Sequence, residues 1–202
     1  MSGPGNRSVV VVPTGTANLA SVFSALRLAG AEPRLAEDGG DIERAARVVL
    51  PGVGSLGAAM EELRARDLVE PLQGRFLEER PLLCICLGLQ LLAAESDESP
   101  GVRGLGVIPS RVVRLRGDAV RLPHIGWNRV VASTGDTVRD GAAYFAHSYH
   151  LECAPAGFSV ARTAHGERFI AAIERGPQVA CQFHPELSGA WGVALLERWL
   201  CR

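Results

Sequence analysis

The chain has 202 residues and a formal net charge of -1, with acidic and basic residues interspersed along it. This length suits one domain with a substantial core, and the charge pattern lacks the clustered Lys and Arg of a nucleic-acid-binding surface. Five cysteines without disulfide-framework spacing, a polar N-terminus and no apolar run of membrane-spanning length indicate a reducing compartment. We therefore expect a cytoplasmic protein that binds neither nucleic acid nor a membrane.

The N-terminal half predicts strands that alternate with helices. After a tail, residues 1–7, that we expect to be disordered, buried strands are predicted at 8–12, 47–50 and 82–85, with a weaker one at 34–36. Apolar residues at helical spacing follow residue 19, residue 55 and residue 86, and the last of these helices is expected to run to Ala93. Strands alternating with helices predict a parallel sheet that is covered on both faces.

The character of the chain changes after Pro100. Short strands are predicted at 112–115, 127–131, 144–151, 158–163 and 169–173, separated by turn-forming pairs, so this half is expected to be more antiparallel. A last buried strand at 179–183 and a C-terminal helix with an apolar stripe close the chain. Because no linker divides it, residues 8–202 are interpreted as a single domain.

Cys86 lies where a buried strand is predicted to pass into a helix. That position is typical of a nucleophile elbow, in which a sharp turn lifts one side chain off the carboxyl end of a parallel sheet. A helix that begins at Leu87 also directs free backbone N–H groups at the sulfur, which favours the thiolate. The alternative interpretation is that Cys86 is one more buried, small, apolar residue.

A cysteine nucleophile needs a base, and that base needs a group to hold its tautomer. His184 and Glu186 are two residues apart at a predicted strand end, so their side chains can project to the same side and meet. Taken singly, His184 could be an ordinary turn histidine and Glu186 a helix-start carboxylate.

A second strand-end loop, residues 51–54, reads Pro-Gly-Val-Gly. Its glycines let backbone N–H groups approach a ligand closely, and together with the N–H of Leu87 they could form an oxyanion hole for an acyl intermediate. The alternative is an ordinary strand-to-helix turn.

Taken together, these residues resemble the triad-type, or class I, glutamine amidotransferases. The markers are Cys-Leu-Gly-Leu-Gln at 86–90, Gln-Phe-His-Pro-Glu at 182–186 and the Pro-Gly loop, in the family's order and spacing. Within that family, the segments 18–22, 50–55, 123–128 and 144–150 resemble the glutaminase subunits of imidazole glycerol phosphate synthase. The resemblance covers nearly the whole chain, and the Pro-His-x-Gly-Trp-Asn and His-Ser-Tyr segments are its most discriminating parts.

The resemblance implies an α/β, flavodoxin-like fold with a mixed, mostly parallel sheet, helices on both faces and an antiparallel C-terminal half. It implies that Cys86 attacks the side-chain amide of glutamine, that His184 moves the protons and that Glu186 orients His184. The thioester is then hydrolysed to glutamate, and no metal or organic cofactor is implied. The residues implied to stabilise the oxyanion or bind glutamine are Gly52, Val53, Gly54, Leu87, Gln90, Ser148 and Tyr149.

In the family, the ammonia passes to a (β/α)8 cyclase subunit within a heterodimer. The cyclase uses it to make imidazole glycerol phosphate and an aminoimidazole carboxamide ribotide, for histidine and purine synthesis. Binding of the partner and of its nucleotide commonly rearranges the oxyanion loop, so we expect weak glutaminase activity in the isolated chain. The flexible glycines at positions 52 and 54 make such a rearrangement physically reasonable.

Three positions depart from the family pattern. Residues 13–18 read Pro-Thr-Gly-Thr-Ala-Asn where relatives have Asp-Tyr-Gly-x-Gly-Asn, and Leu187 replaces a Lys that faces the partner. Both departures bear on coupling to the cyclase. Cys84 replaces the first Gly of the elbow; we hypothesise that this second thiol makes the site sensitive to oxidation, the alternative being a passive core residue.

Three other interpretations remain open. The chain could feed a different synthase, although the Pro-Gly-Val-Gly loop and the Gly-Trp-Asn segment argue against it. It could be a non-catalytic regulatory subunit, although packing alone does not require Cys86, His184 and Glu186 together. It could also be a thiol hydrolase that acts alone, which the altered turn and Leu187 keep possible.

Overall fold

The computed structural model describes residues 7–15, 17–117, 120–132 and 134–202. Residues 1–6 of the expected tail therefore lie outside the described residues. Arg7, the last residue of that tail, is bonded to β2 (Glu32–Leu35): its carbonyl accepts a 2.9 Å hydrogen bond from the N–H of Glu32. Among the described residues, no helix has both the length and the apolar character needed to cross a membrane.

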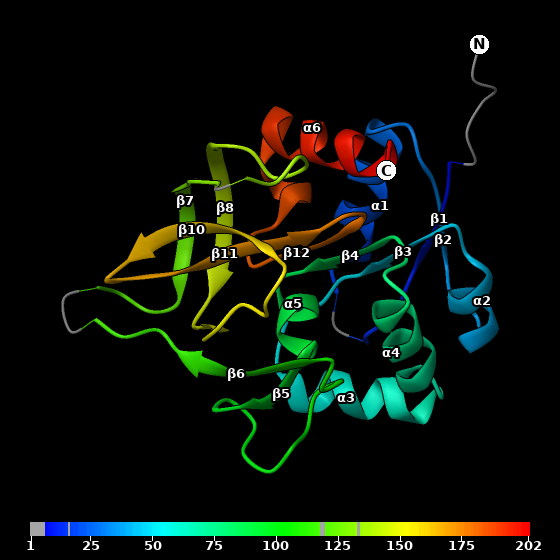
Figure 1. Ribbon diagram of the computed structural model, residues 1–202, viewed down its shortest axis with the longest axis horizontal. Coiled ribbons are helices and arrows are strands. Elements are labelled where there is room, and N and C mark those ends of the chain that lie inside the picture. The colour runs from blue at the N-terminus through cyan, green and yellow to red at the C-terminus, as the bar shows by residue number, and fades with distance from the viewer. Residues whose placement is uncertain (1–6, 16, 118–119, 133) are drawn as a thin grey trace.

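A seven-stranded sheet forms the centre of the molecule (Figure 1). Its strand order is β10-β11-β12-β4-β3-β1-β2; the five strands from β12 to β2 are parallel, and β11 and β10 extend the sheet in antiparallel fashion. β4 lies between β3 and β12 and is buried at every residue, as its uninterrupted apolar sequence predicts. The bounds are β1 (Ser8–Val11), β2 (Glu32–Leu35), β3 (Arg47–Leu50), β4 (Leu82–Ile85), β10 (Ser159–His165), β11 (Glu167–Arg175) and β12 (Gln178–Cys181).

Helices cover both faces of this sheet, and each face has its own apolar core (Figure 1). One core is built with α1 (Leu19–Leu28) and α6 (Gly189–Leu200). The other is built with α2 (Gly39–Arg44), α3 (Leu56–Ala65), α4 (Val69–Leu77) and α5 (Leu87–Leu91). The predicted mixed, mostly parallel α/β fold is confirmed.

Two small sheets complete the C-terminal half. β5 (Ala93–Ser96), β6 (Ile108–Arg114) and β9 (Tyr149–Leu151) form one, and β7 (His124–Val130) pairs with β8 (Gly141–His147) in the other. Some predicted bounds were wrong. The helix after Cys86 ends at Leu91 and Ala93 already begins a strand, while the strand predicted over 144–151 is interrupted at Ser148.

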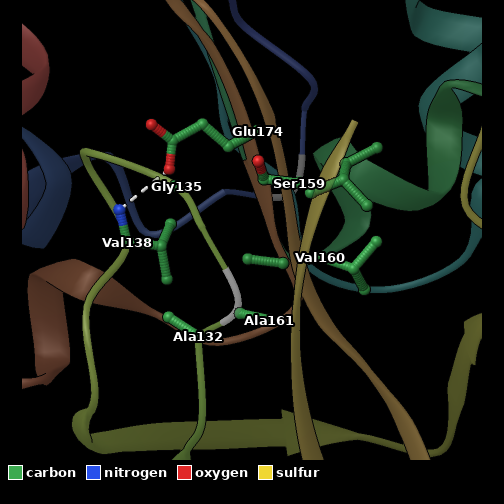
Figure 2. Close-up of a pocket in the computed structure, with 9 residues that line it drawn as sticks. Ala132, Gly135, Val138, Ser159, Val160, Ala161 and Glu174 are labelled. Atoms are coloured by element: carbon green, nitrogen blue, oxygen red, sulfur yellow. Dashed lines mark hydrogen bonds between the residues drawn. The ribbon is translucent and has the colours of Figure 1, made fainter. Parts of the chain in front are cut away.

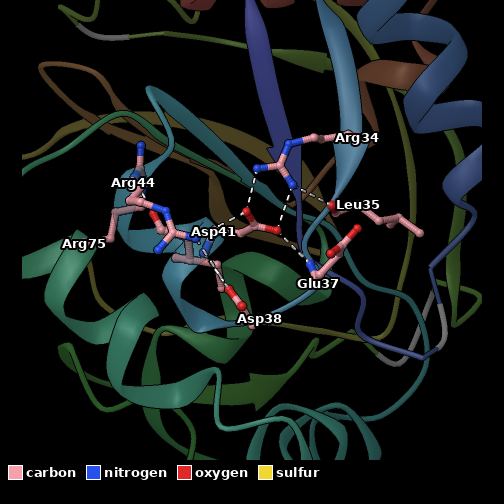
Figure 3. A network of polar contacts seen from close by, with 8 residues as sticks. Arg34, Leu35, Glu37, Asp38, Asp41, Arg44 and Arg75 are labelled. Atoms are coloured by element: carbon pink, nitrogen blue, oxygen red, sulfur yellow. Dashed lines mark hydrogen bonds and ion pairs between the residues drawn. The ribbon is translucent and has the colours of Figure 1, made fainter.

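Arginines join the elements on the α2–α4 side of the sheet (Figure 3). Both terminal nitrogens of Arg34 lie 2.7 Å from the Asp41 carboxylate, and this pairing holds the pKa of Asp41 well below its usual range. Arg75 is buried without a carboxylate partner in the described structure; burial lowers its pKa to about 10. Its guanidinium donates instead to the carbonyls of Ile42, Ala45, Ala46 and Pro81.

Glu174 fixes a loop over the antiparallel edge of the sheet. Its carboxylate accepts three backbone N–H groups, from Asp136 at 3.0 Å, Thr137 at 2.8 Å and Val138 at 3.0 Å; Figure 2 shows the bond from Val138. The cavity beside it encloses only about 10 Å³, room for no more than one water. This buried acid therefore has a structural role and does not face a substrate site.

Replacing Glu174 by Gln is expected to destabilise the fold by about 1–3 kcal/mol, because the new NH2 group would face a buried N–H donor. Urea denaturation followed by circular dichroism measures the difference. Glu152→Gln, at an exposed position, is the matched control and should unfold at the wild-type midpoint. Equal midpoints for both variants would contradict the structural role of Glu174.

Candidate active site

Cys86 occupies a strained turn between β4 and α5. Its φ is +54° and its ψ is -105°, a backbone conformation that costs a residue other than glycine about 1–3 kcal/mol. Two contacts hold the turn: the N–H of Cys86 donates to the carbonyl of Cys181 at 2.7 Å, and Gly88 packs directly on β3. A Cβ at Gly88 would lie 2.0 Å from the carbonyl oxygen of Leu50. This is the geometry of the nucleophile elbow that the sequence predicts.

His184 and Glu186 meet at the end of the neighbouring strand, β12. The Nδ1 atom of His184 lies 2.8 Å from Oε1 of Glu186, and both side chains are 5% exposed. Pro185 begins a short 3-10 turn, η1 (Pro185–Leu187), which brings the carboxylate back to the ring. Because Glu186 engages Nδ1, the remaining ring nitrogen, Nε2, is the one that can serve Cys86.

The environment of His184 favours its protonated form. Burial alone would lower the pKa of the imidazole, but hydrogen bonds and charge interactions with Cys86 and Glu186 outweigh it and raise the pKa to about 10. A histidine beside a cysteine, oriented by a third group, is the arrangement that activates a cysteine nucleophile. The three residues therefore form an arrangement suited to nucleophilic acyl transfer.

The predicted oxyanion loop is closed over the elbow. The N–H of Leu87 donates to the carbonyl of Gly52 at 3.3 Å, so this predicted oxyanion donor is occupied in the observed conformation. Gly54 has a φ of +87°, which favours glycine at that position, and the side chain of Val53 is 36% exposed. A peptide rotation that withdrew the Gly52 carbonyl would free the N–H of Leu87.

Two of the predicted glutamine-binding residues, Gln90 and Tyr149, contact each other. Nε2 of Gln90 donates to the carbonyl of Tyr149 at 2.8 Å and to Oε1 of Gln182 at 3.1 Å, while the carbonyl of Ser148 accepts from Leu115 at 2.9 Å. Gln182 was missed as a site residue. The signal for it was its place in the Gln-Phe-His-Pro-Glu segment, directly before the residues that carry the base.

Cys84 lies apart from this chemistry. Its side chain belongs to the core on the α3–α5 side of the sheet, whereas Cys86 belongs to the opposite core. Burial raises the pKa of the Cys84 thiol far above its ordinary value, which disfavours the thiolate that oxidation requires. These observations favour the passive core residue over the oxidation-sensitive one.

The other two departures lie before α1 and in η1. Within the turn at 13–18, Thr16 lies outside the described residues, and the side chain of Asn18 caps α1 by accepting from the N–H of Ser21 at 3.3 Å. Leu187, in η1, is 40% exposed. In the described part of the chain, no group of three or more His, Cys, Asp or Glu residues is placed to hold a metal ion.

The chain belongs to the class I glutamine amidotransferase family: residues 20–201 match the family described as "Glutamine amidotransferase class-I". Within it, the chain groups with proteins named "Imidazole glycerol phosphate synthase subunit HisH". The one from Yersinia pseudotuberculosis is 41% identical, with 95% of this chain and 98% of the relative covered. The one from Escherichia coli is also 41% identical, with 96% and 98% covered.

A solved structure described as a glutamine amidotransferase shares the fold. It superimposes with a TM-score of 0.74 at 21% sequence identity, and the match covers 95% of this chain and 96% of that chain. The resemblance that the sequence motifs indicate is thus confirmed at the level of family and fold.

Proposed function

We propose that this chain is the glutaminase subunit of an imidazole glycerol phosphate synthase and that Cys86, His184 and Glu186 are its catalytic triad. The observation that carries the proposal is the 2.8 Å pairing of His184 with Glu186, directly beside a cysteine at a strained elbow. The full-length similarity to HisH proteins supports the choice of this synthase over others.

In the proposed reaction, the Cys86 thiolate attacks the side-chain amide carbon of glutamine. The resulting oxyanion is stabilised by the N–H groups of Val53 and Leu87 once the Gly52 carbonyl has withdrawn. His184 gives its proton to the departing nitrogen, so that ammonia leaves and a thioester with Cys86 remains. His184 then takes a proton from water, which attacks the thioester and releases glutamate.

Gly54, Gln90 and the backbone at Ser148 and Tyr149 are proposed to hold the glutamine. Both amide hydrogens of Gln90 already have acceptors, Tyr149 and Gln182. Its Oε1 atom is therefore the group left to contact the substrate.

We propose that a (β/α)8 cyclase subunit docks over this site, in the cytoplasm, and receives the ammonia. Large apolar side chains are exposed on β7 and η1: Trp127 is 58% exposed, Ile125 63% and Leu187 40%. Trp127 and Ile125 share one face of β7, and Trp127 stacks edge-on against Tyr144, whose carbonyl accepts the N–H of His184. An exposed apolar surface of this kind is typical of a protein interface.

The experiment that tests the proposed function is the rate of glutamate release from glutamine, measured alone and with the cyclase subunit plus its nucleotide substrate. Stimulation by the complex, abolished by Cys86→Ala, is the expected result. High activity alone without stimulation would indicate an amidase that acts by itself or with another partner. No glutamate release under either condition would favour a regulatory subunit.

Glu186→Gln is expected to move the alkaline limb of the kcat/KM–pH profile to lower pH by about one unit. Glu186 helps to raise the pKa of His184, so its loss lowers that pKa. The protonated imidazole that must serve the leaving ammonia then disappears at a lower pH. Glutamate release by the complex across pH 6–10 measures the shift. Glu174→Gln, at a buried acid bonded to the 136–138 loop, is the control, and an equal shift in both variants would contradict the role of Glu186.

A further inference from the structure

Gln182 is a buried polar side chain beside the nucleophile that the triad does not use. It has no exposed surface, and its Nε2 atom lies 3.6 Å from Sγ of Cys86. That distance suits an N–H donor to sulfur, whose radius exceeds that of oxygen. The backbone N–H of Gln182 donates to the carbonyl of Ala171 at 2.8 Å, which fixes the residue between β12 and η1.

A chain of hydrogen bonds determines which end of the Gln182 amide faces the sulfur. The carbonyl of Tyr149 can only accept, so the group of Gln90 that lies 2.8 Å from it must be the NH2 group. The same NH2 group lies 3.1 Å from Gln182 and must meet its oxygen. The NH2 group of Gln182 is then the end that points at Cys86.

We propose that Gln182 donates a hydrogen bond to the Cys86 thiolate and stabilises it, and that Gln90 is a positioning residue that orients Gln182. This deepens the proposed function, since it rests on Cys86 as the nucleophile. A hydrogen bond to an ionised acceptor is stronger than one between neutral groups, and burial keeps water from competing for it. The sulfur therefore has two donors, His184 and Gln182.

The two donors differ in what they do during turnover. His184 must release its proton to the leaving nitrogen, whereas the amide of Gln182 keeps its hydrogens throughout. The thiolate charge that Gln182 is proposed to stabilise is lost in the thioester, so the contribution of Gln182 is greatest before glutamine reacts. A measurement on the free thiol is accordingly the most direct one.

The test is the pH dependence of alkylation of Cys86 by iodoacetamide in the isolated full-length chain, followed at the Cys86 peptide by mass spectrometry. Gln182→Met keeps the length of the side chain but removes the donor, and the midpoint of the profile is expected to rise by about one pH unit. Gln182→Glu, nearly the same shape with a charge that repels the thiolate, should raise it further. Gln90→Met should give a smaller rise.

The matched control is Gln178→Met. Gln178 is another buried glutamine and lies on β12, and its Nε2 donates to the carbonyl of Phe76 at 2.7 Å. Its replacement should lower stability without moving the alkylation midpoint. A Gln182→Met protein with a cooperative thermal transition and the wild-type midpoint would overturn the proposal, and so would an equal shift in Gln178→Met.

Should Gln182→Met fail to fold, the near-isosteric Gln182→Glu decides, and an unshifted midpoint there overturns the proposal. Alkylation requires neither glutamine nor a partner. A failure of this inference is therefore distinguishable from a failure of the proposed function, which the glutamate-release assay tests separately.

Discussion

Glutamate release is expected to fall at least about 10⁴-fold when Cys86 is replaced by Ala in the complete synthase complex. The proposed reaction passes through a thioester, and without the sulfur neither bond formation nor expulsion of ammonia can proceed by that route. Members of a catalytic unit do not contribute additively, so loss of the nucleophile removes most of the rate enhancement that the unit provides. Coupled detection of glutamate, with ammonia measured in parallel, covers the required range.

The chain provides its own matched controls for that substitution. Cys84 and Cys181 are buried cysteines on β4 and β12, and burial raises the pKa of both thiols. Cys84→Ala and Cys181→Ala should therefore keep glutamate release within a few-fold of wild type in the complex. If either matched the loss in Cys86→Ala while thermal melting stayed unchanged, the assignment of the nucleophile would be wrong.

The second large effect is expected from the partner. Glutamate release should rise about 10²- to 10³-fold when the cyclase subunit and its nucleotide are added, because one oxyanion donor is worth about that factor. In the observed conformation, Gly52 accepts the N–H of Leu87, so the isolated chain lacks that donor for the oxyanion. Steady-state rates at saturating glutamine, with and without the partner, measure the rise.

Hydrogen exchange at the Leu87 amide offers an independent measurement of the same rearrangement. Its protection should change when the partner and nucleotide bind, while a cyclase preparation denatured by heat should leave both rate and protection unchanged. A fully active isolated chain in which Gly52 still accepted the N–H of Leu87 would contradict this account.

Much of the fold follows from local pattern, and the failures have physical causes. β3 and β4 are buried on both faces, so their apolar runs identify them directly. α2 was not predicted because its first two residues are glycines, which disfavour a helix. A capping hydrogen bond from the N–H of Asp41 to the side chain of Asp38, at 2.9 Å, compensates for them. The helix after Cys86 was predicted to extend too far, because the same apolar run is equally compatible with the buried strand that begins at Ala93.

The proposed triad was recognisable in the sequence because each member has a distinct chemical type at a predicted strand end. Two features of the site were not recognisable from the sequence. The orientation of the Gly52 peptide depends on a single backbone rotation, and the residue types in the loop do not indicate which orientation is adopted. The contact of Gln182 with Cys86 joins residues of two neighbouring strand ends, and their relative height depends on the register that pairs Cys181 with Ile85.

The proposed site is built partly on strands in the interior of the sheet and partly on a loop at the surface. Cys86 and His184 extend from strands in the interior of the sheet, and the amide of Cys86 is bonded across to Cys181. The Gly52 carbonyl belongs to a loop whose Val53 is partly exposed to solvent. In the proposed mechanism, activation needs only a local peptide movement that leaves the hydrophobic core intact, so the chain is not exposed to unfolding or proteolysis while it is without its partner.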